Sequence, residues 1–173
     1  FDPGKREGSI WKRPDHFLRK MSGVPLGVME DAIQTAVETL EGKTDRLTHM
    51  PYRDIPRVQE AIAEARVRYA RARSYVFSSL EKQWDMLERN EELTTEVRAD
   101  SLLSRVNAFQ EGREVTRLLY DIIGGSAIYS LKSPFDRHLR DMQTACQHVV
   151  AQRKTLEAGG SMLLGNPMAH PLV

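Results

Sequence analysis

Residues 56–90, PRVQEAIAEARVRYARARSYVFSSLEKQWDMLERN, form the stretch that decides the fold of this chain. Apolar residues recur in it at steps of three and four, the spacing that places side chains on one face of an α-helix. Pro56 suits the first turn of a helix, and no glycine or proline follows it within the stretch. The pattern predicts one uninterrupted helix of about thirty residues, which is about 45 Å long at ~1.5 Å per residue. Its apolar stripe consists of Val58, Ile62, Ala65, Tyr69, Ala72, Val76, Leu80, Trp84 and Leu87.

The segment upstream of this stretch carries the same helical periodicity. Residues 15–40 repeat apolar side chains at steps of three and four, which predicts a first helix. Gly23 and Pro25 lie between its two halves, so we expect a kink or a break there. Residues 42–54 are expected to form the loop that leads into the long helix.

Two further helices are predicted downstream. The third begins near Thr94 or Thr95, either of which can cap it, and stops at Gly124-Gly125, because glycine readily adopts the left-handed backbone that ends helices. The fourth begins at Ser133 as the cap, with Pro134 in the first helical position, and fades before Gly159-Gly160. Its inward-facing residues are expected to be Phe135, Leu139, Met142, Cys146 and Val149.

Four helices with short connections bury their apolar stripes most simply as an antiparallel, up-down-up-down four-helix bundle. No segment alternates with the period of two that a strand requires, so we expect an all-α fold. The bundle covers residues 15–166. Residues 1–14 form an irregular lead-in, and residues 167–173 form an irregular tail.

Composition excludes several classes of protein. The 173 residues include 25 Lys and Arg against 24 Asp and Glu, a balance that gives no reason to expect nucleic acid or an anionic membrane as a partner. A single cysteine cannot form the internal disulfides that stabilise small secreted proteins. No apolar run approaches the ~18 residues of a membrane span, so we expect a cytoplasmic protein. None of the five histidines follows a glutamate by three residues, which argues against a di-iron bundle, and no metal site is predicted.

Two features could carry chemistry. The paired glycines Gly124 and Gly125 would let backbone amides approach a phosphate, although a plain helix stop explains them more simply. His148 lies seven residues after Asp141, two turns along the polar side of the predicted last helix. Histidine exchanges protons near neutrality, but periodicity alone favours a solvated side chain.

The sequence around these features resembles a known family. Residues 122–129, IIGGSAIY, and residues 133–141, SPFDRHLRD, resemble the C-terminal helical domain of the acyl-CoA dehydrogenase fold, whose motif runs from Gly-Gly to Arg-x-x-Arg-Asp. Arg137 and Arg140-Asp141 match that motif. The resemblance covers about residues 16–166, and it implies that a helical domain and a β-domain precede this bundle, with a flavin between them.

The resemblance also implies an activity. Most dehydrogenases of this fold carry a catalytic glutamate shortly after Arg-Asp, whereas residues 145–150, ACQHVV, contain no carboxylate. An Arg-Asp followed by a histidine is similar instead to the two-component flavin-dependent monooxygenases, such as the 4-hydroxyphenylacetate and dibenzothiophene enzymes. There a separate reductase supplies reduced flavin, and oxygen is transferred to a small, commonly aromatic substrate. The resemblance makes His148 the acid/base residue.

By the same resemblance, Gly124 and Gly125 become a turn close to the flavin, contacting a neighbouring subunit's cofactor. Arg46 or Arg53 would contact the flavin or its phosphate, and the sequence does not distinguish FMN from FAD. The family's bundles associate, so we expect a homotetramer. Two alternatives stay open: an acyl-CoA dehydrogenase or oxidase whose base is not recognised, and a non-catalytic helical oligomerisation domain. Apolar side chains off the main stripe that such an assembly could bury are Val67, Tyr75 and Phe77.

Overall fold

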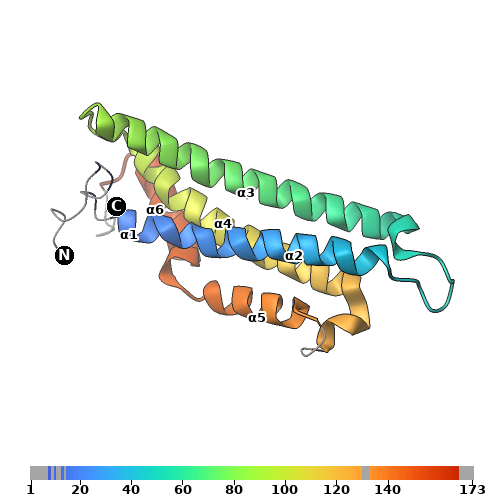
Figure 1. Cartoon of the computed structure of the whole chain (residues 1–173). Helices are drawn as coiled ribbons and strands as arrows, with labels where there is room; N and C mark the ends of the chain where they lie inside the picture. The colour runs from blue at the N-terminus through green and yellow to red at the C-terminus, as the bar shows by residue number, and fades with distance from the viewer. Residues whose placement is uncertain (1–7, 9, 11–12, 14, 130–132, 168–173) are drawn as a thin grey trace.

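The computed structural model describes residues 8, 10, 13, 15–129 and 133–167, and these form helices and connecting loops (Figure 1). An isolated bridge between Thr44 and Pro51 is the nearest approach to a strand among the described residues. The all-α prediction is therefore confirmed. The α-helices are α1 (His16–Arg19), α2 (Gly23–Glu41), α3 (Pro56–Glu88), α4 (Thr95–Ile123), α5 (Phe135–Ala145) and α6 (Arg153–Leu163).

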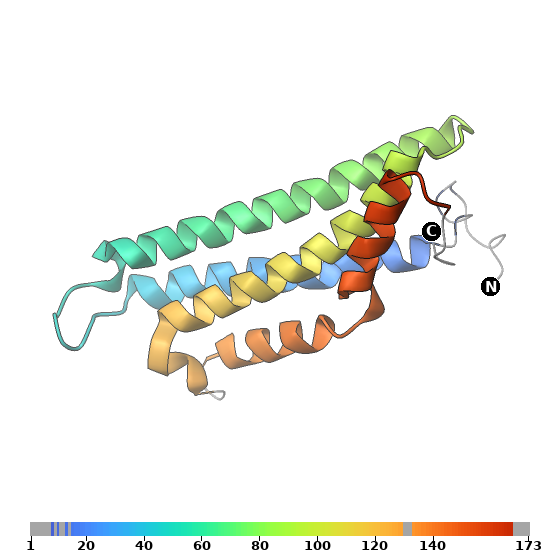
Figure 2. The ribbon, with the colours of Figure 1, turned by 180° about the vertical axis from the view of Figure 1, so that it is seen from behind.

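Helices α2, α3, α4 and α5 run in alternating directions, and α4 lies at the centre, in contact with each of the others. Seen from behind, α6 crosses α4 steeply near the end of the molecule that holds α1 (Figure 2). The expected four-helix bundle thus carries a fifth helix, because the predicted last helix is two separate helices.

The bounds of α3 and α4 follow the sequence signals. Pro56 occupies the start of α3, which runs without a break to Glu88. The Thr94 hydroxyl oxygen accepts the Val97 amide at 3.3 Å and caps α4. Gly124 has φ of +66° and ends α4, a conformation that a residue with a side chain adopts only with strain.

The first helical segment breaks one turn earlier than predicted. A 3₁₀ turn, Lys20–Ser22, separates α1 from α2. Pro25 lies in the first turn of α2, where an amide has no partner within the helix and proline costs little. Phe17 does not join the core, since it is 54% exposed.

The prediction of one continuous last helix is wrong. Helix α5 ends at Ala145, a 3₁₀ turn follows over Val149–Ala151, and α6 contains both Gly159 and Gly160. A Cβ atom on Gly159 would lie 2.7 Å from Leu103 Cδ2, so this glycine permits the close crossing of α6 over α4 instead of ending a helix. Ser133 provides no side-chain cap either, because Pro134 occupies the N-cap position of α5, where no side-chain hydrogen bond is made.

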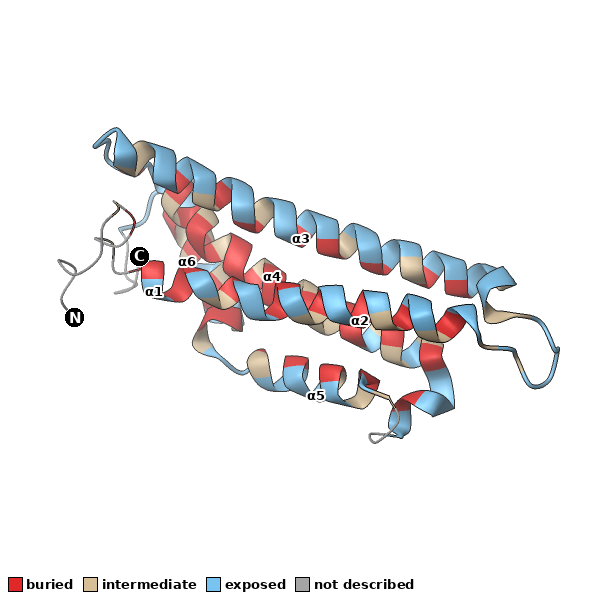
Figure 3. Cartoon of the chain, in the orientation of Figure 1, coloured by how far each residue is buried: buried red, intermediate tan, exposed pale blue. Residues whose placement is uncertain are grey.

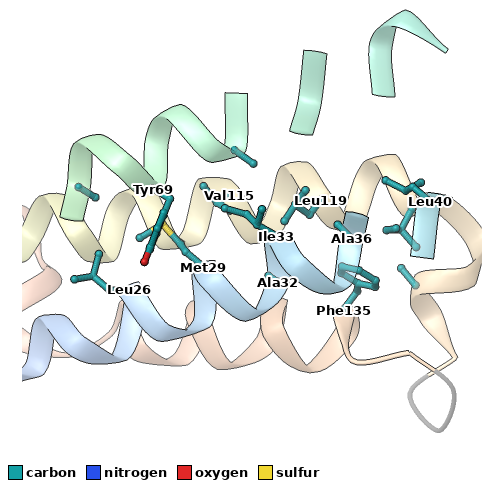
Figure 4. Close-up of a cluster of buried hydrophobic side chains, with 14 of the residues drawn as sticks. Leu26, Met29, Ala32, Ile33, Ala36, Leu40, Tyr69, Val115, Leu119 and Phe135 are labelled. Carbon is teal, nitrogen blue, oxygen red and sulfur yellow. The ribbon is translucent and has the colours of Figure 1, made fainter. Parts of the chain in front are cut away.

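The core divides into an apolar part and a smaller polar part. Figure 3 shows buried residues along the inner faces of the helices, and Figure 4 shows apolar side chains from α2, α3, α4 and α5 meeting between them. The predicted stripe of α3 holds as far as Val76, but beyond it Ser79 and Gln83 are buried while Trp84 is 39% exposed. Beyond Val76, polar residues take over the buried face of α3 because a buried polar cluster lies at this end of the helix.

This polar cluster joins α1, α3 and α4. Asp15 accepts hydrogen bonds from the Gln83 side-chain amide at 2.8 Å and from the Ser101 hydroxyl at 3.0 Å. Arg19 donates to the Ser101 carbonyl, to the Ser104 hydroxyl and to the Ser79 hydroxyl. The cluster fixes the short α1 against the ends of two long helices. No helix in the described part of the chain is long and apolar enough to cross a membrane.

Candidate functional site

A pocket of about 970 Å³ opens where the loop between α2 and α3 meets the turn after α4. We call it the loop–turn pocket. Its two sides are far apart in sequence, and Figure 1 shows both at the end of the bundle away from α1. The pocket is lined by Thr39, Gly42, Lys43, Thr44, Asp45, Arg46, Leu47, Tyr52, Gly125, Ser126, Ile128 and Tyr129.

The loop side of the pocket is ordered by its own hydrogen bonds. The Asp45 carboxylate accepts the Leu47 amide at 3.0 Å and the Thr48 amide at 2.8 Å, and the Asp45 amide donates to the Met50 carbonyl. Bonds from the backbone and hydroxyl of Thr48, with the Leu47 amide, hold the pKa of the Asp45 carboxyl below its ordinary value. The carboxylate is thus engaged inside the loop, and Arg46 beside it is exposed at the pocket.

Lys43 connects the two sides of the pocket. Its ammonium donates to the carbonyl of Ile123, the last residue of α4, and lies 4.6 Å from the centre of the Tyr52 ring. Burial, followed by the nearby charge of Arg46, lowers the pKa of Lys43. The pocket therefore combines two cationic side chains with two tyrosine rings, a composition suited to an anionic, ring-bearing ligand.

The predicted cofactor residues are only partly brought together. Arg46 and Gly125 both line the loop–turn pocket, and Gly124 precedes it at the end of α4. Arg53 does not line the pocket, and its guanidinium Nε lies 4.0 Å from the carboxylate of Asp54 on the outer side of the loop. Arg46 is therefore the better placed of the two arginines.

His148 occupies a different setting from the predicted one. It lies outside α5, where it caps the 3₁₀ turn Val149–Ala151, so it does not continue the polar face that carries Asp141. Its Nδ1 accepts the Val150 amide at 3.3 Å. Since Nδ1 accepts, a neutral imidazole carries its proton on Nε2, and that atom is left for a ligand. The side chain itself is exposed.

The surface beside His148 is apolar. Ala145 and Val149, on either side of the turn, pack together with Met21 and Val28 of the first helical segment over a small buried cluster. Each of these four side chains is partly buried against the same cluster, and we call this set of residues the apolar ledge. An imidazole next to such a ledge could hold a proton near an apolar or aromatic molecule.

Helix α5 separates the turn after α4, which lines the loop–turn pocket, from the 3₁₀ turn that His148 caps (Figures 1 and 2). The helix has 11 residues and is about 16 Å long at ~1.5 Å per residue. The two features must serve different ends of a long ligand, or different ligand molecules.

His138 is a buried contact that the sequence patterns did not indicate. Its Nε2 lies 2.7 Å from the Asp31 carboxylate on α2, its ring meets Phe135 edge-on, and the side chain is 7% exposed. The signal was present, because positions 135, 138 and 142 share one face of a helix. The pair ties α5 to α2. No group of three or more His, Cys, Asp or Glu side chains that could hold a metal occurs within the described residues.

Comparison with known proteins confirms the resemblance to the acyl-CoA dehydrogenase fold. The family model described as "Acyl-CoA dehydrogenase, C-terminal domain" matches residues 20–153. The chain is 25% identical, over 166 residues, to an indole-3-acetate monooxygenase of Acinetobacter baumannii, covering 95% of this chain and 42% of that protein.

Two solved structures share the fold. XiaF from Streptomyces sp., in complex with FADH2 and glycerol, superposes with a TM-score of 0.83 at 15% identity, over 92% of this chain and 41% of XiaF. Dibenzothiophene monooxygenase TdsC from Paenibacillus sp. A11-2, in complex with FMN and indole, superposes with a TM-score of 0.78 at 19% identity, over 95% of this chain and 42% of TdsC.

The chain thus spans about two fifths of the length of each protein it matches. The helical fold, the Gly-Gly to Arg-Asp motif and the family match over residues 20–153 agree, and the chain belongs to the family of acyl-CoA dehydrogenase C-terminal domains.

Proposed function

We propose that this chain is the C-terminal bundle of a flavin-dependent monooxygenase. The complete protein would take reduced flavin from a separate reductase and hydroxylate a small aromatic substrate with O₂. The observation that carries the proposal is the segment after α5: it presents an exposed His148 beside an apolar ledge and contains no carboxylate to act as a dehydrogenase base. The Acinetobacter relative is an indole-3-acetate monooxygenase, and its aromatic substrate agrees with this choice.

His148 would act through Nε2. Because Nδ1 accepts the Val150 amide, the neutral ring begins as a hydrogen-bond donor at Nε2. It can donate to an oxygen or nitrogen atom of the substrate without any change in the turn. To accept a proton at Nε2, the ring must first move its own proton to Nδ1, which breaks the bond to Val150. The geometry thus favours His148 as a hydrogen-bond donor to the substrate, and as a proton acceptor only when the turn rearranges.

The loop–turn pocket would hold part of a flavin. Lys43 and Arg46 supply positive charge, Tyr52 and Tyr129 supply rings, and Gly125 exposes backbone without a side chain in the way. Bound reduced flavin would supply the electrons that activate O₂. The composition of the pocket fits a phosphate-bearing group of this kind, FMN or FAD.

The separation of the pocket from His148 suggests how the chains assemble. If His148 serves the flavin of its own chain, the pocket at the other end of α5 serves the flavin of a neighbouring chain. We therefore propose a homo-oligomer, a tetramer by the resemblance. Val67 and Phe77, 54% and 43% exposed on α3, are available to such an interface. Tyr75 is not, because it is half-buried and donates to Asp100.

The test combines the complete protein with a flavin reductase, NADH and ¹⁸O₂, with indole-3-acetate and simple phenols as substrates. Mass spectrometry is expected to find one ¹⁸O atom in the product. His148→Ala should lower the rate by about 10²–10⁴-fold, the usual contribution of a positioned acid or base. Gln147→Ala, a change at the exposed neighbouring position, is the control. Product without ¹⁸O, or full activity in His148→Ala, would refute the proposal.

An acyl-CoA dehydrogenase is the second candidate, favoured by the family match itself. It predicts that an acyl-CoA bleaches the protein-bound oxidised flavin in the absence of oxygen. The lack of a carboxylate in residues 145–150 argues against it, because removal of the α-proton of a thioester requires a base.

A further inference from the structure

Lys43 makes a contact that neither the family match nor the proposed reaction assigns. Its ammonium reaches the carbonyl of Ile123 across 80 residues of sequence, from the start of one loop to the end of α4. The same lysine closes its own loop, since its carbonyl accepts the Tyr52 amide at 2.9 Å, and its ammonium lies over the Tyr52 ring. One side chain therefore holds the loop side and the turn side of the loop–turn pocket together.

The helix ends beside the loop–turn pocket carry negative partial charge that a cation such as Lys43 offsets. Helices α2 and α4 both end at the pocket, at Glu41 and Ile123. The C-terminal end of a helix carries partial negative charge on carbonyls that lack partners, and it repels anions. Neither last turn contains a basic residue to offset this charge. Lys43 supplies the missing cation from outside the helix, at the carbonyl of the last residue of α4.

We propose that Lys43 is a positioning residue that converts the C-terminal end of α4 into a corner able to accept an anion. By bonding to Ile123 it removes the repulsion from the helix end and fixes the Gly125 turn against the loop that carries Arg46. The anion is the phosphate of the flavin, so this inference rests on the proposed function. Lys43 does not touch the reacting atoms, since the pocket and His148 lie at opposite ends of α5.

The test compares Lys43→Met with Lys43→Arg in the complete protein, using FMN and inorganic pyrophosphate as probes. Lys43→Met keeps the length of the side chain and removes its charge. We expect about tenfold weaker binding of both probes, which corresponds to the interaction of a cation with a partly buried helix end. Amide hydrogen exchange of Gly125–Ile128 should also accelerate. Lys43→Arg should restore most of both effects, and Lys82→Met, at an exposed position on α3, should show neither.

Each other outcome is decisive. Faster exchange with unchanged affinity would mean that Lys43 only ties the fold together, and the inference would be wrong. Weaker binding with unchanged exchange would mean that Lys43 contacts the phosphate directly and does not act by position. If the wild-type protein binds neither probe, there is no anion-accepting corner. Binding of FMN that depends on Lys43, together with no hydroxylation by any substrate, would overturn the proposed function and leave this inference standing.

Discussion

Two buried arginines at the α1 end of the bundle should respond in opposite ways to the same substitution. Arg19 is 8% exposed and donates three hydrogen bonds, to the Ser101 carbonyl at 3.3 Å and to the hydroxyls of Ser104 at 3.2 Å and Ser79 at 3.0 Å. Arg105 is 1% exposed, and none of its three guanidinium nitrogens has a hydrogen-bond partner among the described residues. Burial lowers the pKa of Arg105 to about 10.

The expected magnitudes follow from these contacts. Arg19→Met removes three bonds from a charged donor, each worth about 1.5–3 kcal/mol, and regains part of that by removing a buried charge. A net loss of about 3 kcal/mol is expected. Arg105→Met removes a buried charge that makes no hydrogen bond. The cost of burying this charge outweighs its attraction to Asp15, since burial is the largest cause of its lowered pKa, and an apolar side chain of similar length removes that cost. A gain of about 1–2 kcal/mol is expected.

Urea unfolding of the 173-residue chain, followed by circular dichroism, measures both changes. With a slope of about 2 kcal/mol per molar urea, the midpoint should fall by about 1.5 M in Arg19→Met and rise by about 0.5–1 M in Arg105→Met. The two variants have the same net charge and are matched controls for each other. A midpoint that falls in Arg105→Met as far as in Arg19→Met would refute the reasoning, because it would show that Arg105 makes stabilising bonds, for example to ordered water or an anion.

The remaining predictions concern helix ends and one tyrosine. Thr94→Ala should cost about 1 kcal/mol through loss of the cap on α4, measured by the same unfolding assay. Gly124→Ala should cost about 1–3 kcal/mol because of its positive φ, whereas Gly125→Ala, with no positive φ and no atom near a new Cβ, should be close to neutral. Burial and then the bond to Asp100 raise the pKa of Tyr75 well above that of free tyrosine. Its folded-state pKa exceeds the unfolded one, so its contribution to stability is intact below pH ~10 and is lost as pH rises through the folded value. Absorbance at 295 nm should therefore show the same tyrosinate content at pH 11 in the wild type and in Tyr75→Phe, and a lower content in the variant would contradict this.

Much of the fold could be predicted because the signals are local. The spacing of apolar residues and the absence of glycine and proline set α3, while the Thr94 cap and the glycines after Ile123 set α4. The motif from Gly124 to Asp141 also carried the family assignment, since it lies within one continuous segment that the family model matches. Each of these features depends on neighbours in sequence, and residue spacing records such neighbours directly.

The candidate site was less predictable because its parts come from distant segments. The sequence offered both Arg46 and Arg53, and only the fold of the loop, ordered by Asp45, places Arg46 at the pocket. Lys43 gave no signal at all, because its partner Ile123 lies 80 residues away. No pattern of spacing reports a contact between the start of a loop and the end of another helix.

The sequence by itself determined the helical class, the long helices and the family, since these depend on periodicity and capping within single segments. Only the tertiary structure decided where the last helix breaks. No glycine or proline marks Ala145, yet Cys146 and Val150 are both buried against Leu18 and Phe109, and His148 turns the chain between them. The tertiary structure likewise placed Ser79 and Gln83, and not Leu80 and Trp84, on the buried face of α3. Ser79 and Gln83 provide hydrogen-bonding partners for the buried guanidinium of Arg19 and the buried carboxylate of Asp15. The need for these partners outweighs the preference for apolar residues in a core.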